Sequence, residues 1–165
     1  MQVEIRYRPS YSLALVKLDP GEAIRAEAGA MVSMSPGLAL ETKVAGGLLA
    51  GLKRSFLGGE SFFMNTYRAP AQGGEITLAP VLPGDMLVRE LRDESLLVQS
   101  GSFVASSEGI NLDTKWSGAR TFFAREGLIM LRVSGTGTLI LSSYGAIHEV
   151  DLGPGPPHGW PHSWR

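Results

Sequence analysis

Short runs of apolar residues, or of apolar residues alternating with polar ones, follow one another along most of this chain. Such runs are typical of β-strands, because alternation indicates one buried face and a continuous apolar run indicates two. Turn-forming sequences such as Asp19-Pro20-Gly21 separate them, since proline fixes φ and glycine accepts a positive φ. The pattern predicts strands at 12–18, 30–34, 38–42, 61–67, 75–78, 86–91, 95–99, 102–106, 110–114, 128–133, 138–142 and 146–150.

The number and spacing of these strands predict an all-β fold, either a β-sandwich or a double-stranded β-helix. One segment differs, because Leu48, Leu52 and Phe56 recur at a helical spacing within 46–56, although the nearby glycines disfavour a helix. We expect a short helix or an ordered loop there. A length of 165 residues suits a single domain, placed at 1–152, followed by an irregular, disordered tail at 153–165.

The chain also repeats itself, which predicts two copies of one packing unit at about 12–80 and 81–152. Four residues recur at one constant spacing: Gly29, Gly37, Lys43 and Gly46 match Gly101, Gly109, Lys115 and Gly118. The Pro-Gly turn at 20–21 also matches the one at 83–84, which places an insertion in the second copy before Gly101. Residues 151–155 resemble the opening turn of a third copy.

Composition and charge exclude several classes of function. A net charge of −1 and a pI near 6.3 provide no overall attraction to nucleic acid or to an anionic membrane. The lack of cysteine excludes disulfides, thiolate metal sites and thiol nucleophiles, and it fits a cytoplasmic protein. The first residues do not form a signal peptide and the chain has no apolar run long enough to span a membrane, so no integral membrane segment is expected.

Candidate catalytic groups are few. The sequence has neither a Gly-x-Ser-x-Gly elbow nor a second histidine in the domain that could join His148 in a triad. His158 and His162 lie in the flexible tail, which cannot pre-organise a metal site. Four acidic residues near the second Pro-Gly turn are interpreted as solvated charges: Asp85, Glu90, Asp93 and Glu94. We therefore expect no enzymatic activity, no metal and no cofactor, and we assign no catalytic residue.

The segment 46–60 is the first candidate interaction surface. It lacks both glycine motifs that cradle phosphates. Its apolar residues Leu48, Leu52 and Phe56 either close the end of the sandwich or, together with Lys53 and Arg54, contact a partner or a membrane surface.

The second candidate interaction surface comprises Lys115, Trp116 and Arg120. Cations beside an aromatic ring are the combination that holds single-stranded nucleic acid, because bases stack on the ring while the cations pair with phosphates. The alternative is that the aromatic residues of this region pack a connection between strands and that its arginines are ordinary surface charges.

Five motifs, in a fixed order, resemble one known family. They are AEAGAMVSMSPG at 26–37, GGLLAGLKRSFLGGESFFMNTY at 46–67, LPGD at 82–85, QSGSFVAS at 99–106 and LSSYGAI at 141–147. On these motifs the chain is identified as a member of the AIM-type mitochondrial biogenesis family, which includes bacterial and archaeal domains of unknown function. The likeness covers about residues 1–153.

The resemblance implies an all-β, TRAP-like fold of the double-stranded β-helix type without enzymatic activity, and it associates the mitochondrial relatives with inner-membrane organisation. It also implies a third copy beginning near 153–155, where this chain instead has a tail rich in Pro, His and Trp. A missing copy would leave a sheet edge or an apolar face uncovered. We therefore expect a homo-oligomeric β-scaffold or binding module with an unknown protein partner; nucleic-acid binding and peripheral membrane contact are the alternatives.

Overall fold

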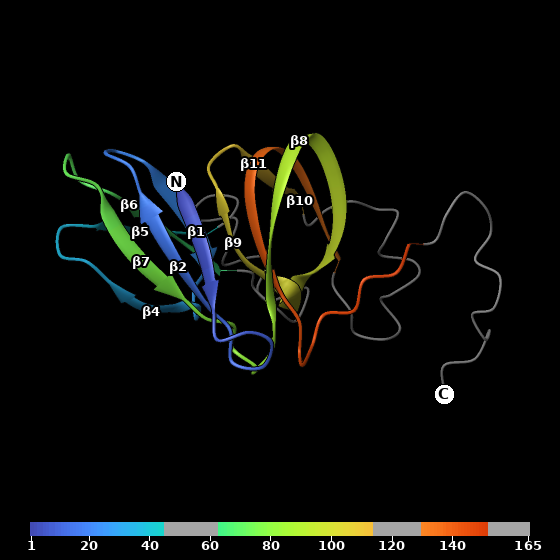
Figure 1. Ribbon diagram of the computed structural model, residues 1–165. Coiled ribbons are helices and arrows are strands. Elements are labelled where there is room, and N and C mark those ends of the chain that lie inside the picture. Colours follow the sequence, from blue (N-terminus) through green and yellow to red (C-terminus); the bar gives the residue numbers. More distant parts are fainter. Residues whose placement is uncertain (45–62, 114–129, 152–165) are drawn as a thin grey trace.

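The computed structural model describes residues 1–44, 63–113 and 130–151, and these residues are organised almost entirely as β-strands (Figure 1). The elements are β1 (Gln2–Arg6), β2 (Leu13–Leu18), β3 (Ala23–Glu27), β4 (Met31–Met34), β5 (Ala39–Val44), β6 (Phe63–Arg68), β7 (Gly74–Leu78), β8 (Met86–Gln99), a 3₁₀ turn (Ser100–Ser102), β9 (Phe103–Ser107), β10 (Ile110–Asp113) and β11 (Met130–Ser142). The all-β prediction is confirmed. The segment 46–56 and the tail at 153–165 lie outside the described residues.

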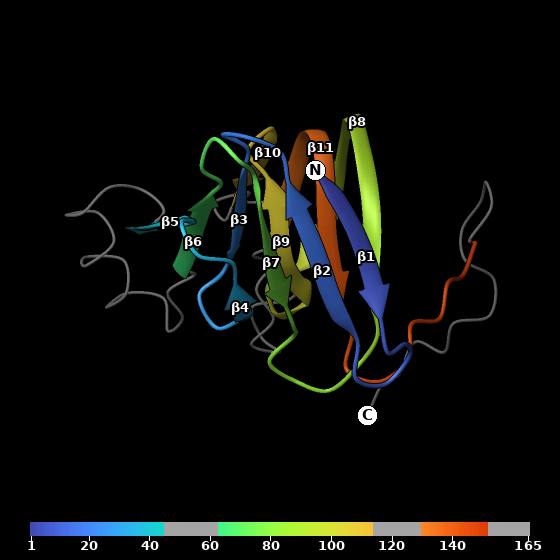
Figure 2. The same cartoon turned by 60° about the vertical axis from the view of Figure 1, so that its left-hand side comes forward.

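The strands form two antiparallel sheets. The first has the order β1-β2-β7-β4, and Figure 2 shows it in front of the second. In the second sheet, β8 follows one edge of β11 along its whole length, while β10 and β9 lie one after the other along the opposite edge. Beyond β9 the order continues through β3 and β6 to β5. The long strands β8 and β11 curl together, as Figure 1 shows.

Two clusters of buried apolar side chains stabilise this arrangement. The larger joins both sheets, and it contains the alternating residues Ala14, Val16 and Leu18 of β2 together with Ile24 of β3 and Ile140 of β11. The smaller is formed by the curled strands and β9–β10; its buried members are Leu91, Val98, Phe103, Ile110, Leu131, Val133 and Leu139. Removal of these apolar surfaces from water is the main driving force for the fold.

Most strands expected from the apolar pattern are present, with four differences. Strands β1 and β3 were not predicted, because each carries charged residues at alternate positions. The runs 86–91 and 95–99 belong to one strand, β8, and the runs 128–133 and 138–142 fall largely within one strand, β11. The predicted strand 146–150 is wrong, since these residues have no regular secondary structure. Strands β8 and β11 stay paired through the polar residues at their centres, with one irregularity in the pairing between Gly135 and Thr136.

Strand registers correspond closely between the two halves of the chain. Glu27 of β3 pairs with Met64 of β6, and Gln99 of β8 pairs with Met130 of β11. The spacing from Glu27 to Gln99 equals the one at which the four residues recur in the sequence, and we call it the repeat offset. The partner strands are related by the somewhat shorter spacing from Met64 to Met130. The spacing at which residues recur in the sequence therefore also relates these two strand ladders.

Other ladders follow the same correspondence. The two spacings that relate β3·β6 to β8·β11 also relate the β5·β6 ladder to the β10·β11 ladder. The β4·β7 and β9·β11 ladders correspond as well, and each has one irregularity, which leaves out Val32 in β4 and Val104 in β9. Even this local departure from regular pairing lies at the same position in both halves.

The registers also correct the alignment of the Pro-Gly turns. The last part of β8 occupies the position of β3 at the repeat offset, whereas its first part occupies the position of β2 at a spacing one residue longer. Gly21, between β2 and β3, therefore corresponds to Asp93 inside β8. The match of Pro20-Gly21 with Pro83-Gly84 is wrong, because the latter turn precedes β8 altogether, and no insertion before Gly101 is required.

Candidate interaction surface

The residues that the sequence proposed as an interaction surface all lie outside the described ranges: Leu48, Leu52, Lys53, Arg54, Phe56, Lys115, Trp116 and Arg120. Their predicted role therefore stays a prediction. The described residues contain three other features that bear on function: a polar cluster at one end of the molecule, a set of neutralised arginines, and open sheet edges with exposed apolar side chains.

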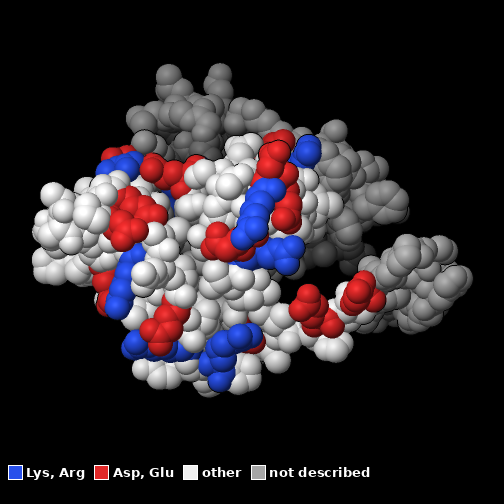
Figure 3. Space-filling view, turned by 45° about the horizontal axis from the view of Figure 1, so that its top comes forward, with Lys and Arg blue, Asp and Glu red and all other residues white. Residues whose placement is uncertain are grey.

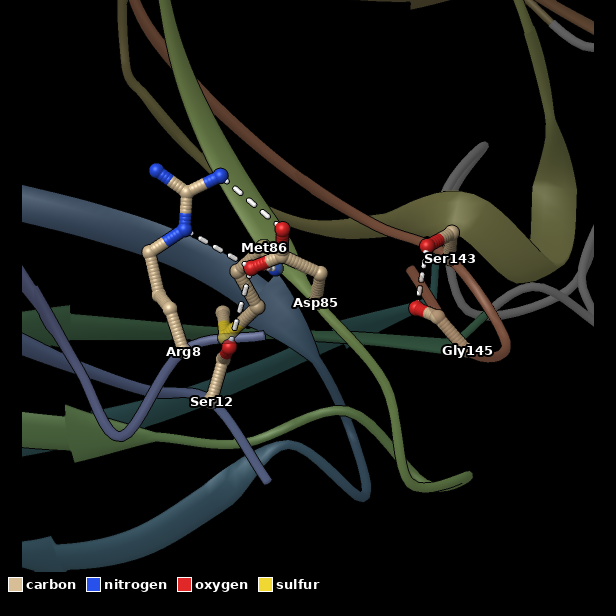
Figure 4. A network of polar contacts seen from close by, with 6 residues as sticks. All are labelled: Arg8, Ser12, Asp85, Met86, Ser143 and Gly145. Atoms are coloured by element: carbon tan, nitrogen blue, oxygen red, sulfur yellow. Dashed lines mark hydrogen bonds and ion pairs between the residues drawn. The ribbon is translucent and has the colours of Figure 1, made fainter. Parts of the chain in front are cut away.

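The polar cluster is centred on the Asp85 carboxylate, just before β8 (Figure 4). Arg8 binds it in a bidentate manner, with Nε 2.8 Å from Oδ1 and Nη2 2.9 Å from Oδ2. The Ser12 hydroxyl and the backbone N–H of Met86 also donate to Oδ1, at 3.1 and 2.8 Å. The hydrogen bonds from Arg8, together with those from Met86 and Ser12, lower the pKa of Asp85 to about 2 although burial opposes this shift.

The same cluster ties three chain segments together. The backbone N–H of Ser12 donates to the carbonyl of Gly84, and the N–H of Asp85 donates to the carbonyl of Gly145. Ser143 returns a bond to the carbonyl of Asp85, and its hydroxyl donates to the carbonyl of Gly145 (Figure 4). The interpretation of Asp85 as a solvated charge is wrong, because its residue surface is only 3% exposed. The Asp85 carboxylate connects the segment between β1 and β2 to the start of β8 through hydrogen bonds.

Exposed apolar side chains surround this cluster. Tyr7, Tyr11, Val81, Leu82 and Tyr144 are all exposed, and they belong to the same three segments that the Asp85 cluster joins. Exposed aromatic residues are common at protein interfaces, because they bury a large area with little loss of side-chain freedom. Nothing in the described residues shows what covers them.

Several arginines are neutralised by nearby carboxylates. Arg68 Nη2 lies 2.7 Å from Glu108 Oε1, Arg6 Nε lies 2.9 Å from Glu4 Oε1, and Arg89 pairs more loosely with Glu94. In the view of Figure 3, positive and negative side chains are interspersed. A surface of this kind attracts polyanions weakly, because nucleic-acid affinity depends on phosphates meeting unpaired cations.

Arg25 of β3 is used internally. Its Nη2 atom donates to the carbonyl oxygens of Ser107, Glu108 and Ile110, where the chain passes from β9 to β10. Burial lowers the pKa of Arg25. The charged residue that concealed β3 in the sequence therefore has a structural role, since it satisfies carbonyls in the bend between two strands.

Chemistry-bearing groups are sparse in the described ranges. Within them, no three His, Asp or Glu side chains gather as a metal site would require, and His148 is exposed. A small depression of about 140 Å³ lies over β1 and β2, lined by Gln2, Val3, Glu4, Leu15 and Lys17. Its volume is below the several hundred Å³ typical of ligand pockets. No helix among the described residues is long and apolar enough to cross a membrane.

Of the edge strands in the described residues, β4, β5 and β8 carry exposed apolar side chains, and Leu40 of β5 is 49% exposed. Strand β4 ends the first sheet, and all four of its residues are exposed, including Met31, Val32 and Met34. Among the described strands β8 pairs only with β11, and Leu97 near its end is 51% exposed. An open edge with apolar side chains is a template for adding another strand.

The described residues thus define an all-β protein built of two antiparallel sheets with open edges. The chain belongs to the family described as mitochondrial biogenesis AIM24, which matches residues 3–157. The family expected from the five motifs is thereby confirmed.

Two bacterial proteins illustrate the relationship. An uncharacterised protein of Streptococcus pyogenes serotype M6 is 28% identical over an alignment of 164 residues, and this alignment covers 94% of this chain and 65% of that protein. The crystal structure of a Streptococcus pyogenes protein superposes with a TM-score of 0.65 at 28% identity, covering 87% of this chain and 65% of the other. The chain therefore spans about 65% of the length of these relatives.

Proposed function

We propose that the protein is a non-enzymatic assembly module, a β-scaffold that joins copies of itself through its sheet edges. The observation that carries this proposal is the pair of open edges, β4 and β8, each with exposed apolar side chains. The chain provides backbone donors and acceptors and apolar contact area there, which are the two requirements of strand addition.

The proposal includes an internal duplication. Support comes from the ladder registers, in which β4, β5 and β6 correspond to β9, β10 and β11 down to the position of one irregularity. Repeated units stack because each buries its apolar face on the next. In this chain Val104, Ala105 and Ile140 of the second copy share a core with residues of the first.

Assembly is favoured over catalysis and nucleic-acid binding by the way polar groups are used. Arg8, Arg25 and Arg68 are each engaged with carboxylates or carbonyls of the same chain, and Asp85 is bound by three donors from its surroundings. Side chains so engaged hold the scaffold together. The proposed location is cytoplasmic, consistent with a cysteine-free sequence, and cell fractionation tests it.

Light scattering on the purified chain, over a wide range of protein concentration, tests the assembly proposal. We expect a mass that is a multiple of 17.6 kDa and rises with concentration before reaching a plateau. A mass of 17.6 kDa at every concentration would overturn the proposal, and attention would then move to the exposed aromatic residues Tyr7, Tyr11 and Tyr144.

A further inference from the structure

The molecule contains an internal example of the junction that would join two copies. Strand β3 of the first half pairs antiparallel with β9 of the second half, with Arg25 opposite Ser106 and Ala26 opposite Ala105. Within this ladder, Ala105 and Ser106 of β9 are fully buried.

The strands that correspond to these two are the open ones. At the repeat offset, β3 corresponds to the end of β8, and β9 corresponds to β4. Figures 1 and 2 show β4 and β8 on opposite sides of the described body, so one molecule does not pair its own two edges. The open strands β8 and β4 are therefore the counterparts of two strands, β3 and β9, that pair with each other inside the molecule.

The exposed side chains agree with this correspondence. Met31, Val32 and Met34 of β4 are 36%, 58% and 40% exposed, whereas their counterparts Phe103, Val104 and Ser106 are buried. On the other side, Leu97 takes the position of Arg25 and is exposed, while its neighbour Val98 is buried in the second core, as Ala26 is buried in the first. At the paired positions of the internal junction, Arg25 and the buried Ser106 therefore correspond to the exposed apolar residues Leu97 and Met34.

From this correspondence, and resting on the proposed assembly function, we infer that β4 of one molecule pairs antiparallel with the end of β8 of a second copy. Transfer of the β3·β9 register places Leu97 opposite Met34 and Val98 opposite Ser33. The contact is head-to-tail, because each molecule contributes a different edge on each side. Repetition of such a contact builds either a closed ring or an open filament.

Disulfide trapping between single-cysteine variants tests this register. The chain has no cysteine of its own, so Met34→Cys and Leu97→Cys can be prepared separately and mixed in equal amounts under mild oxidation. Directly opposed residues in an antiparallel pair are close enough for a disulfide. We expect a disulfide-linked heterodimer to be the main product of the mixture, whereas each variant alone gives little dimer.

A one-residue slip provides the matched control. Ser33→Cys mixed with Leu97→Cys should give much less heterodimer, because adjacent side chains of a strand point to opposite faces. Equal trapping with positions 33 and 34, or no trapping in either mixture, would overturn the proposed register.

A charge substitution separates this inference from the general proposal. Leu97→Lys alters an exposed side chain, so it should preserve the fold by circular dichroism while reducing the mass to that of a monomer. Leu40→Lys, at an exposed leucine on the edge strand β5, should leave the mass unchanged. If the Leu97→Lys variant is still an oligomer, the proposed β4·β8 interface is wrong but the proposed assembly function stands. If the parent chain is a monomer, both proposals are wrong.

Discussion

The two halves of the molecule use the same strand pairings but differ in how the strands are connected. In the first half, β2 and β3 are separate strands, as are β6 and β7. In the second half the corresponding pairs are continuous, and they form β8 and β11. The difference teaches that ladder register can be retained while connections change, because register depends on which residues face the core.

Residues at the breaks explain the difference. Pro20 and Pro70 lie between the separate strands of the first half, and proline cannot donate a ladder hydrogen bond. The second half has Arg92 and Asp93 in place of Pro20 and Gly21. Asp93 has a positive φ of 58°, close to the 73° of Gly21, so the backbone conformation is retained while the strand continues.

Phe103 and Met31 occupy corresponding positions but differ in burial, and Phe103 has the larger, fully buried side chain, so its truncation should have the largest effect. Phe103→Ala should reduce the free energy of unfolding by about 3–5 kcal/mol, because its fully buried ring leaves a cavity in the second core. Met31→Ala should cost less than about 1 kcal/mol, since the side chain is partly exposed on β4. Urea unfolding followed by circular dichroism measures both. Equal losses would contradict the correspondence between a covered and an open strand.

The irregularity within β11 provides the second test. Gly135 has a φ of 122°, and a Cβ there would meet the carbonyl oxygen of Gly109. Gly135→Ala should therefore cost about 2 kcal/mol in urea unfolding. In the first half, Ala69 occupies the corresponding position, after β6 has ended. Gly101→Ala is the control and should have little effect, because no atom approaches its added methyl group.

The ion pair between Arg8 of the first half and Asp85 of the second makes the connection of the two halves dependent on pH. The pKa of Asp85 is lowered from the usual 3.8 to about 2. Its stabilisation is therefore fully present above about pH 4 and is lost as the pH falls towards 2. We expect a loss of about 1 kcal/mol across this range, since Arg8 is partly exposed and solvent screens the pair.

Comparison of urea unfolding at pH 5 and pH 2.5 measures this contribution. Asp85→Asn should already be destabilised at pH 5 and should lose less on acidification than the parent chain. Glu4→Gln, which removes a carboxylate from an exposed pair on β1, should retain the pH dependence of the parent. Identical acid sensitivity of the parent and Asp85→Asn would contradict the assignment.

The smallest expected effect concerns the shared left-handed position. Gly21→Asp should cost less than about 1 kcal/mol, because aspartate tolerates this conformation, as Asp93 does in the other half, and no atom lies near the added Cβ. Gly21→Val should cost about 2 kcal/mol, since a β-branched residue is strained at positive φ. Equal costs for the two variants in thermal unfolding would show that the positions are not equivalent.

Sequence patterns anticipated much of the fold, but not all of it. Apolar alternation identified β2, β4, β7 and β9 from the sequence alone. It missed β3, whose Arg25 bonds carbonyls far along the chain, and no local pattern reveals such partners. It divided β8 and β11 because the polar residues at their centres resemble turns, although pairing continues there.

The candidate surface was less predictable than the fold. Sequence reasoning directed attention to residues in 46–60 and 115–120, which lie outside the described ranges, and it did not identify the Asp85 cluster. Asp85 and Arg8 are 77 residues apart, so only the folded chain brings them together. The exposed residues of β4 could not be distinguished from core residues, because an apolar run predicts burial whether or not a partner strand is present.

By itself, the sequence determined the all-β class and the family, because these depend on local alternation and recurring motifs. Only the tertiary structure decided which strands are continuous, which carboxylate is buried and which edges stay open. These properties depend on pairing between residues distant in the chain: β9 has strand β3 beside it, whereas among the described strands its counterpart β4 pairs only with β7.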